Sequence, residues 1–469
     1  MFSHRLLVAL SVATTLAYAT PPPSPPLSSV REFCNLTVDV AVIGGGGGGA
    51  YAAARLHQQG YKVALIERDG RLGGHVNTYR DPTSGGTFDY GVQIFSNISV
   101  VRDFFGHYKI PLVPAGPLGG STSQTVDFSS GLPITVPQDT AAIGQALMGY
   151  GAQVAKYPSL NTFWKIPQPI PEDLLMPFGA FLQKYNLQSL AYIVYSYQQG
   201  LANVLAQTTL YLIRFFDLQQ VQDIANSAFM VNGLQNNQAL YDAVATELGN
   251  SVLLNTQATK IVRTDNAVLL DAKSTNTDYQ ITAKKLLIAI PPTPEKLQFL
   301  DLHDDEFSVF SKLNASHYWN SIVLNSGLPP NLTLTNISPA APLAIPSVPG
   351  VYTINMTPFP GVVCPLYGSD HALSDSDVQA DILATIKRIR QGMNISVTTE
   401  PEFVEFNSHN PFHFTVSPEE ILGGFYDRME ALQGQRKTWF TGAAWSKPAS
   451  SAIWNFTEYQ ILPGLMEGL

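Results

Sequence analysis

The feature that most constrains the fold is a short apolar run that leads directly into six consecutive glycines, residues 44–49. Residues 38–43 have the composition of a buried β-strand. Gly44, Gly46 and Gly49 then follow the G-x-G-x-x-G spacing of loops that bind the pyrophosphate of a dinucleotide. The first glycine permits a tight turn, the second lets the backbone approach the phosphates, and the third lets the next helix pack closely on the strand.

The residues after the glycines are also typical of a dinucleotide-binding fold. We expect a helix at about residues 50–59, ending at Gly60, and a second strand at residues 62–67. Glu67 lies 23 residues after Gly44, where an acidic side chain accepts hydrogen bonds from a ribose hydroxyl. Consecutive glycines also occur in flexible low-complexity segments. The order of strand, helix, strand and acid favours the nucleotide site.

The composition excludes several classes of protein. With 45% hydrophobic and 13% charged residues among 469, the chain is predicted to be globular, with two or three domains. The net charge of -9 and the lack of basic runs argue against a nucleic-acid partner. No cluster of cysteine, histidine and acid has metal-ligand spacing, so we expect no metal. Past the N-terminus no run reaches about 18 apolar residues, so we expect no transmembrane segment.

The N-terminus resembles a secretory signal peptide. An apolar stretch at residues 6–17 follows a short basic start and precedes small residues suited to cleavage. We therefore expect a signal peptide at residues 1–19, a Pro-rich spacer at residues 20–37, and a secreted or lumenal protein. Such a route permits a disulfide between Cys34 and Cys364, but spacing leaves a pair and two free thiols equally open.

Eight N-x-[S/T] sequons agree with the secretory route. Asn97 and Asn455 lie beside motifs that we expect to be buried, so we do not expect them to be glycosylated. The cluster at residues 314–355 suggests one exposed glycosylated face. The six candidates for glycosylation are Asn35, Asn314, Asn331, Asn336, Asn355 and Asn394.

Two kinds of segment alternate along the chain. The nucleotide-binding domain is predicted to consist of residues 38–99, 236–295 and 430–469. Residues 100–235 and 296–429 are predicted to form an inserted substrate-binding domain. The first insert is rich in aromatic and amide side chains and is expected to be mostly helical, which suits a pocket for an apolar ligand. The predicted fold class is therefore α/β of mixed type, with a discontinuous Rossmann-like domain and an inserted substrate domain.

Individual elements have start and stop signals. Ser374 and Ser417 are placed to cap helices, and Pro291 follows a buried strand that it would end. The further helices expected are residues 237–248, a helix from 374 to about 389, 417–433 and 450–459, and the further strands are 252–254, 258–262, 268–271, 286–290 and 438–440.

With these residues in hand, the chain resembles the FAD-dependent amine oxidase superfamily. It is most similar to fungal oxidoreductases of the beta-cyclopiazonate dehydrogenase type, which serve secondary-metabolite pathways. The stretches that carry the resemblance are residues 40–67, 71–78, 89–95, 255–261, 287–292 and 424–445. The glycine loop with Glu67, the Gly73-Gly74 turn and the Thr441-Gly442-Ala443 turn together form a signature for FAD rather than NAD.

The resemblance implies a role in FAD binding for each of these residues. Gly44, Gly46 and Gly49 would hold the pyrophosphate, and Glu67 the adenosine ribose. The last helix would direct its N-terminus at the N1 and O2 edge of the flavin, where negative charge gathers on reduction. The remaining expected contacts are Arg71, Gly73, Gly74 and His75 along the phosphate and ribityl side, Ala258 at the adenine, and Gly442 and Ala443 at the pyrophosphate and ribityl chain.

Two positions depart from the superfamily pattern, and both remove a charged contact. His75 stands where arginine usually follows the paired glycines, and Ala443 stands where glutamate usually follows Gly442. No lysine aligns with the active-site lysine that many amine oxidases place near flavin N5. The nearest polar candidates for catalysis are His409 and His413. The alternative interpretation of each is a loop histidine that forms a structural hydrogen bond and takes no part in catalysis.

Three functions follow from the resemblance. The first is oxidation of a bulky, largely apolar secondary metabolite, such as a terpenoid, indole or polyketide-derived compound, by hydride transfer to flavin N5 with desaturation or ring closure. The second is an amine oxidase that makes an imine and hydrogen peroxide. The third is a flavin-binding protein without catalysis. Since only one dinucleotide fingerprint is present, we favour an oxidase or dehydrogenase over an NADPH-dependent enzyme, with O2 as electron acceptor.

Overall fold

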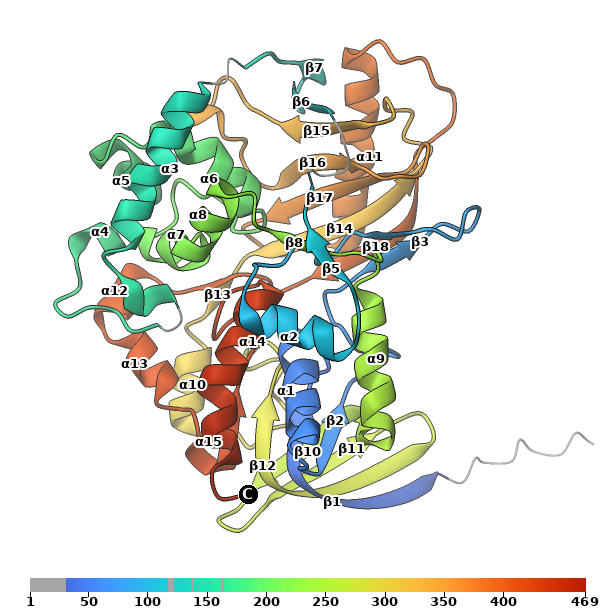
Figure 1. Cartoon of the computed structure of the whole chain (residues 1–469), viewed down its shortest axis with the longest axis vertical. Coiled ribbons are helices and arrows are strands. Elements are labelled where there is room, and N and C mark those ends of the chain that lie inside the picture. Colours follow the sequence, from blue (N-terminus) through green and yellow to red (C-terminus); the bar gives the residue numbers. More distant parts are fainter. Residues whose placement is uncertain (1–30, 117–121, 137–138, 162–163) are drawn as a thin grey trace, which may run out of the picture.

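The computed structural model describes residues 31–116, 122–136, 139–161 and 164–469. The expected signal peptide and the spacer up to residue 30 lie outside the described residues. Within the described ranges the strands form two seven-stranded sheets and three two-stranded ones. Figure 1 shows one large sheet with α1 and α9 in the lower half of the molecule and the other with α11 in the upper half. The fold class predicted from the sequence, a mixed α/β fold with a Rossmann-like part, is confirmed.

The first sheet gathers strands that are distant in sequence, in the order β10-β11-β12-β1-β2-β9, with β20 also paired to β12. β9, β2, β1, β12 and β20 run parallel, whereas β11 is antiparallel to both β10 and β12. The continuous buried run at residues 40–43 is typical of a strand covered on both faces. The strands are β1 (Glu32–Ile43), β2 (Val63–Ile66), β9 (Val252–Leu253), β10 (Gln257–Arg263), β11 (Val268–Lys273), β12 (Thr277–Ile288) and β20 (Thr438–Phe440).

β1 begins earlier than the sequence predicted. Residues 32–37, which we assigned to the spacer, pair in parallel register with residues 277–282 of β12. Arg31 fixes the start of the strand, because its guanidinium donates to the Asp278 carboxylate and to the Ser274 carbonyl oxygen. The predicted end of the spacer at residue 37 is therefore wrong. The pairing partner lies more than 240 residues away, which local patterns cannot reveal.

Helix α1 (Gly47–Gln58) begins inside the glycine run, three residues earlier than predicted. Gly60 has a φ of +88° and ends the helix as a left-handed residue, as the sequence predicted. α1 packs against β2, against α9 (Gln238–Leu248) and against α14 (Ser450–Phe456). The glycine loop is thus held between the first sheet and the end of the chain.

The second large sheet has the order β18-β14-β17-β16-β15-β6-β7 and is antiparallel except where β6 runs parallel to β15. Helix α11 (Asp375–Gly392) covers it, and Ser374 caps this helix by accepting a hydrogen bond from Asp377 N, as predicted. Val378, Ile382 and Ile386 of the predicted stripe are buried in the core beneath. The strands are β6 (Thr122–Asp127), β7 (Leu132–Pro133), β14 (His317–Leu324), β15 (Leu332–Asn336), β16 (Gly350–Met356), β17 (Val363–Ser369) and β18 (Glu402–His409).

The first inserted segment is mostly helical in its described part, as the sequence predicted. It also contributes β6 and β7 to the second sheet and pairs β5 (Leu112–Pro114) with β8 (Met230–Asn232). Figure 1 shows most of these helices at the upper left, beside the second sheet. The helices of this segment are α2 (Ser99–His107), α3 (Thr140–Val154), α4 (Glu172–Leu175), α5 (Phe178–Lys184), α6 (Ala191–Tyr197), α7 (Thr209–Phe215) and α8 (Leu218–Ala225).

The single helix predicted at residues 417–433 is wrong, because the structure has two. Ser417 caps α12 (Pro418–Leu422) as expected, but the chain then breaks at Gly424, whose φ is +72°. A second helix, α13 (Phe425–Glu430), starts there. A left-handed residue cannot continue an α-helix, so the pair of glycines at 423 and 424 outweighs the apolar periodicity.

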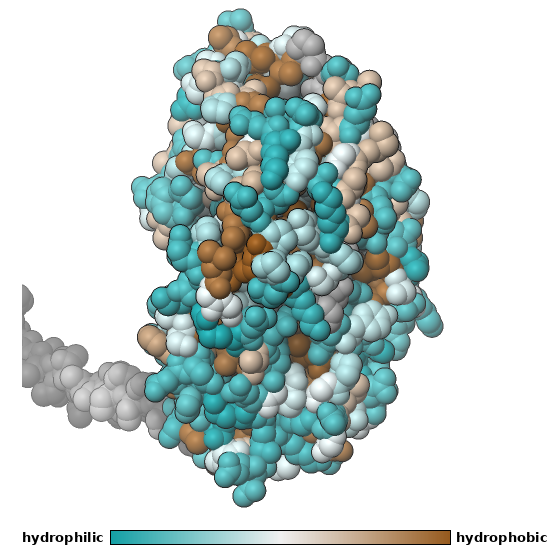
Figure 2. Space-filling view, turned by 90° about the vertical axis from the view of Figure 1, so that its left-hand side faces the viewer, coloured by the Kyte–Doolittle hydropathy of each residue, from teal (hydrophilic) through white to brown (hydrophobic). Residues whose placement is uncertain are grey.

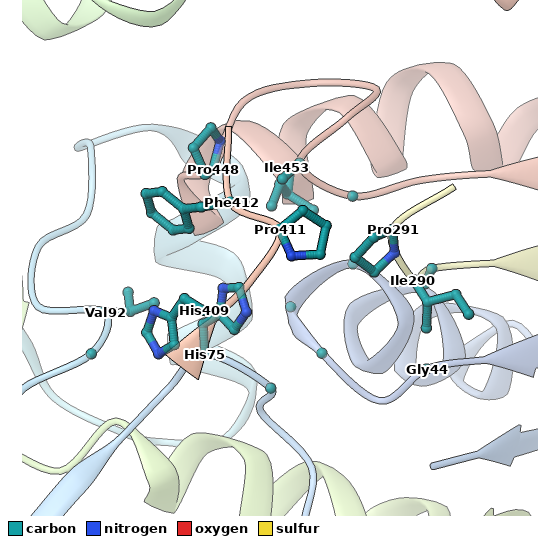
Figure 3. A pocket seen from close by; sticks show the side chains of 18 of the residues that line it. Gly44, His75, Val92, Ile290, Pro291, His409, Pro411, Phe412, Pro448 and Ile453 are labelled. Carbon is teal, nitrogen blue, oxygen red and sulfur yellow. The ribbon is translucent and has the colours of Figure 1, made fainter. Parts of the chain in front are cut away.

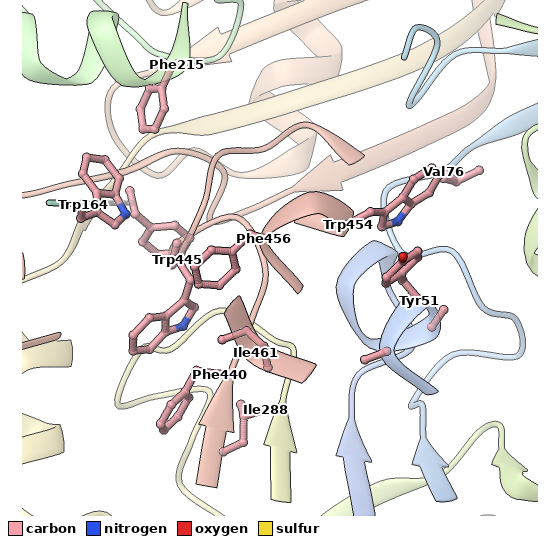
Figure 4. Close-up of a cluster of buried hydrophobic side chains, with 14 of the residues drawn as sticks. Tyr51, Val76, Trp164, Phe215, Ile288, Phe440, Trp445, Trp454, Phe456 and Ile461 are labelled. Atoms are coloured by element: carbon pink, nitrogen blue, oxygen red, sulfur yellow. The ribbon is translucent and has the colours of Figure 1, made fainter. Parts of the chain in front are cut away.

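The end of the chain is locked onto the start by aromatic side chains. After α14 the chain makes a π-helical turn, η7 (Thr457–Ile461), and then α15 (Leu462–Met466), so the last helical segment is longer than predicted. Trp454 Nε1 donates to the Gly47 carbonyl oxygen at 3.0 Å, and its ring stacks on Tyr51 with centroids 5.9 Å apart. Figure 4 shows Trp454 over Tyr51, and Phe440, Trp445 and Phe456 in a neighbouring cluster.

The surface in Figure 2 is mostly hydrophilic, with apolar patches interspersed. No helix in the described ranges is both long and apolar enough to cross a membrane. Cys34 and Cys364 are both free thiols.

The sequons differ in exposure. Asn97 is exposed although the adjoining motif is buried at Phe95, and its side-chain oxygen accepts from Arg102. Asn336 is half-buried, with its amide nitrogen donating to the Val351 carbonyl oxygen. Asn355 is also half-buried, and its side-chain oxygen accepts from Thr353. The exposed candidates are Asn35, Asn314, Asn331 and Asn394.

Candidate functional site

A cavity of about 810 Å³ lies where the ends of the first sheet meet the inserted segments. Its wall includes the glycine loop, the residues after β2, the end of β18 and the C-terminal turn. Figure 3 shows side chains from these distant segments pointing into one space, with Gly44 and Pro291 at one end and Phe412 and Pro448 at the other. The candidate residues that line it are Gly44, Gly46, Glu67, Arg71, Gly73, Gly74, His75, Ala258, His409, His413, Gly442 and Ala443.

The glycine loop has the geometry that a close approach requires. Gly44 has a φ of +97°, and a Cβ there would lie 2.5 Å from Ile290 Cγ2. A Cβ on Gly49, which does not line the cavity, would lie 1.8 Å from the Gly44 carbonyl oxygen, so this glycine sets the spacing of helix and strand. Gly46 is different, because its nearest neighbour would be Gly74 Cα at 3.9 Å. The open side of the loop is therefore at Gly46, on the cavity wall.

The Gly73-Gly74 turn packs directly on the glycine loop. Gly73 N donates to the Gly45 carbonyl oxygen at 2.9 Å, and a Cβ on Gly74 would lie 3.0 Å from Gly46 Cα. Glu67 is buried beside them and accepts hydrogen bonds from Gly45 N and Asp69 N. Two backbone donors thus hold its carboxylate at the cavity wall, where lone pairs remain for a ligand hydroxyl.

The C-terminal turn closes the cavity from the other side. Gly442 has a φ of +114°, and Thr441 N donates to the Ile288 carbonyl oxygen at 3.0 Å. A Cβ on Gly48 would lie 3.0 Å from Thr441 Cγ2, so the first and last parts of the chain are in contact here. Ser450 and Ile453 of α14 also line the cavity.

His75 and His409 form a parallel stack on the cavity wall, with ring centroids 4.0 Å apart and planes within 4°. Desolvation by the surrounding wall and the nearby cations Arg68, Lys296 and Arg71 lower the pKa of His75 to about 4, although its side chain is open to the cavity. Burial, and to a lesser extent the charge on Arg71, hold the pKa of His409 well below its ordinary value. Both rings are therefore neutral near pH 7.

His413 is also buried on the wall, against Phe215 and Phe412. Burial lowers its pKa to about 3, and its Nδ1 atom is sealed from solvent without a hydrogen-bond partner among the described residues. His413 is therefore a neutral residue that packs against the aromatic rings and leaves one ring nitrogen without a hydrogen bond.

Sequence reasoning missed Lys447, the buried cation of the far wall. Its Nζ atom donates to Asp217 Oδ2 at 2.6 Å and to the Phe215 carbonyl oxygen at 3.3 Å. Burial lowers the pKa of Lys447, and the facing Asp217 carboxylate opposes that shift. Lys447 follows the predicted C-terminal turn closely, but its partner lies 230 residues earlier, so no local pattern indicates the pair.

Comparisons with known proteins agree with this geometry. A family model described as an NAD(P)-binding Rossmann-like domain matches residues 42–108. The chain is 37% identical over 486 residues to the FAD-dependent oxidoreductase oblC of Cochliobolus heterostrophus, with 100% of both chains covered. It is 31% identical to beta-cyclopiazonate dehydrogenase of Aspergillus flavus, covering 90% of this chain and 92% of that protein.

The chain belongs to this family of FAD-dependent oxidoreductases. The resemblance inferred from its motifs is thereby confirmed. Solved structures with the same fold include a CLA-producing fatty acid isomerase from P. acnes, with a TM-score of 0.74, 18% identity and coverage of 91% of this chain and 98% of that one. Putrescine oxidase bound to putrescine matches with a TM-score of 0.64, 16% identity and coverage of 92% and 99%. The chain is therefore an FAD-dependent enzyme of the amine-oxidase fold.

The cavity wall fits FAD. The open backbone at Gly46, the carboxylate of Glu67 and the turn at Gly442 are the groups that would hold the pyrophosphate, the ribose and the ribityl chain. When bound, FAD supplies an acceptor for a hydride from the substrate. Among the described residues, no group of three histidine, cysteine or acidic side chains lies close enough to hold a metal ion.

Proposed function

We propose that this flavoenzyme oxidises a bulky, largely apolar metabolite by removing a hydride from carbon, which leads to desaturation or ring closure. The observation that carries the proposal is the lining of the cavity beyond the glycine loop. Aromatic, amide and proline side chains dominate there, among them Tyr197, Phe215, Tyr318 and Phe412. Apolar walls with a few placed polar groups are typical of sites for large apolar ligands.

The charges of the wall argue against an ammonium substrate. The acidic residues that line the cavity in the described ranges are Glu67, which was assigned to the adenosine ribose, the nearby Asp69, and Glu295. The far wall instead carries the cation Lys447. Asp217 balances the charge of Lys447 and does not itself line the cavity, so among the described residues this wall offers no free carboxylate to bind a cationic amine.

The aromatic rings also fit the apolar metabolite better than an amine held between two rings. Tyr318 and Phe412 stack on each other with centroids 4.9 Å apart, so no slot for a substrate lies between them.

Anaerobic reduction of the bound flavin tests the proposal. Purified enzyme is mixed with apolar metabolites that carry an activated C–H bond, with simple amines, and with NADPH, and loss of the flavin absorption band is followed. Bleaching by an apolar metabolite, followed by reoxidation with O2, supports the proposal. Fast bleaching by simple amines alone would establish an amine oxidase, and fast bleaching by NADPH would contradict the oxidase half-reaction.

We also propose that the protein enters the secretory pathway and carries glycans. The apolar N-terminal stretch and the exposed sequons at Asn35, Asn314, Asn331 and Asn394 support this. Asn336 and Asn355 are poorer acceptors, because their amides already hydrogen-bond within the second sheet. A shift in gel mobility after glycosidase treatment of protein from the native host is the expected result, and an unchanged mobility would argue against it.

A further inference from the structure

A chain of polar side chains in the cavity wall, with Asn320 behind it, determines where His409 carries its proton. Arg71 Nη2 donates to Asn77 Oδ1 at 2.8 Å. Asn77 Nδ2 lies 2.9 Å from His409 Nε2 and 3.5 Å from Asn320 Oδ1. All three residues after Arg71 are buried, so these contacts are not exchanged with bulk water.

The chemistry of arginine fixes every group in this chain. A guanidinium only donates hydrogen bonds, so the atom of Asn77 that faces Arg71 must be its carbonyl oxygen. The amide nitrogen of Asn77 therefore faces His409 and donates to Nε2, which must be unprotonated. Asn320 agrees with this orientation, because its own amide nitrogen donates to the Tyr90 carbonyl oxygen at 2.9 Å and leaves its oxygen for Asn77. His409 is thus the neutral tautomer with its proton on Nδ1.

The Nδ1–H group of His409 is the part of the ring that is available to a ligand. It makes no hydrogen bond to the described part of the chain, and unlike His413 Nδ1 it is not sealed from solvent. The ring lines the cavity at the end of β18, next to His75 (Figure 3). His75 packs on one face at 4.0 Å, and Tyr318 and Phe412 lie about the ring at 6.0 and 6.1 Å.

We propose that His409 binds an acceptor oxygen of the substrate through Nδ1–H and does not act as a base. Nδ1 already carries a proton, and the lone pair of Nε2 is occupied by Asn77, so neither nitrogen can take a proton from substrate carbon. The proposal rests on the proposed function and narrows it: the apolar metabolite carries a carbonyl or enol oxygen. The partner of His409 is therefore an oxygen in the substrate, and the chain from Arg71 keeps the donor in place.

The tautomer is measured on the holoenzyme without any substrate. Nitrogen-15 chemical shifts of labelled histidine distinguish protonated from unprotonated ring nitrogens, and loss of one signal set in His409→Asn assigns His409. We expect a protonated Nδ1 and an unprotonated Nε2 near neutral pH. In Asn77→Asp the carboxylate would accept from Nε2, and we expect the Nε2 signal to become that of a protonated nitrogen. A protonated Nε2 in the wild-type enzyme would overturn the proposal.

A matched pair of variants tests the ligand contact. The amide nitrogen of asparagine takes the position of His Nδ1, whereas that of glutamine reaches the position of Nε2. The probes are 2-acetylnaphthalene and 2-ethylnaphthalene, a ketone and a hydrocarbon of similar shape, with binding read from the perturbed flavin spectrum. Since one neutral hydrogen bond contributes about 0.5–1.5 kcal/mol, we expect the ketone-to-hydrocarbon affinity ratio to fall about 2- to 13-fold in His409→Gln and to change less than about twofold in His409→Asn.

Equal ratios in the wild-type enzyme and in both variants would overturn the contact with oxygen. These measurements separate this proposal from the proposed function. The ring nitrogens and the affinity ratio report on His409 alone, whereas a failure of every apolar metabolite to bleach the flavin would bear on the oxidation itself.

Discussion

Alanine variants of Gly46 and Gly49 distinguish two roles of the glycine loop. Gly46 allows FAD to approach the backbone, whereas Gly49 allows the helix to pack on the strand. In Gly46→Ala the new Cβ has Gly74 Cα at 3.9 Å as its nearest neighbour, and the backbone at φ -70° and ψ -171° is open to any residue. In Gly49→Ala the Cβ would lie 1.8 Å from the Gly44 carbonyl oxygen, a backbone atom that cannot rotate away. The first variant should therefore fold and the second should be strained.

The magnitudes follow from these contacts. At Gly46 the weaker cap costs about 0.5–1 kcal/mol, and the stiffer unfolded chain returns about 0.4–1 kcal/mol, so the apoprotein should be nearly as stable as wild type. A Cβ on the open side displaces the pyrophosphate, and losing one charge-assisted hydrogen bond costs about 1.5–3 kcal/mol, or about 10- to 150-fold in the Kd for FAD. At Gly49 alanine gains about 1 kcal/mol of helix propensity but the overlap costs about 3 kcal/mol or more, so stability should fall by about 2 kcal/mol.

Urea unfolding of the apoproteins and FAD titration by quenching of flavin fluorescence give the two quantities. Gly60→Ala is the control, because its φ is +88° and no atom lies within 4 Å of the new Cβ. It should lower the free energy of unfolding by about 1 kcal/mol through backbone strain and leave FAD affinity unchanged. Wild-type FAD affinity in Gly46→Ala, or wild-type stability in Gly49→Ala, would refute the reasoning.

Three further predictions concern buried charges. Lys447→Met should destabilise the protein by about 3–5 kcal/mol because it leaves the Asp217 carboxylate buried without its cation, and urea unfolding of Lys447→Met with Asp217→Asn should recover part of the loss; equal losses in the single and double variants would contradict the pairing. Burial raises the pKa of Asp89 to about 6, so the wild-type protein loses stability as pH rises from about 3.8 to about 6. Urea titrations above that range should show Asp89→Asn to be more stable than wild type by up to about 3 kcal/mol. Below that range the variant should show no gain in stability. The pKa shift of Glu306 has the opposite sign, because Arg263 at 2.5 Å lowers the pKa of this carboxyl below 4.5. The stability that Glu306 contributes is therefore lost as pH falls through the lowered pKa. Near neutral pH, Glu306→Gln should lower the free energy of unfolding, measured in urea, by about 3 kcal/mol.

Local signals predicted several turns and helix ends well. The turn at Gly44, the end of α1 at Gly60 and the caps at Ser374 and Ser417 each depend on a few adjacent residues, and the structure has them where the sequence placed them. The break at Gly424 could also have been predicted, had the glycine pair been weighed against the apolar stripe.

Contacts between distant residues were out of reach. His75 and His409 were both identified as departures or candidates, but nothing local indicates that β18 ends beside the Gly73-Gly74 turn and stacks the two rings. The pair Lys447 and Asp217 is hidden in the same way, since each partner taken alone looks like a surface charge. The side of the cavity that faces the substrate depends on these long-range contacts. The sequence therefore predicted the residues that bind the cofactor better than the residues that line the substrate side.

The central claim is that FAD lies between the beginning and the end of this polypeptide. Hydrogen–deuterium exchange of the apoprotein and the FAD complex tests it most directly, because it reads the protection of each segment. We expect FAD to slow exchange together in peptides that cover residues 44–49, 67–75 and 441–453. Protection of the glycine loop with unchanged exchange across residues 441–453 would contradict the account.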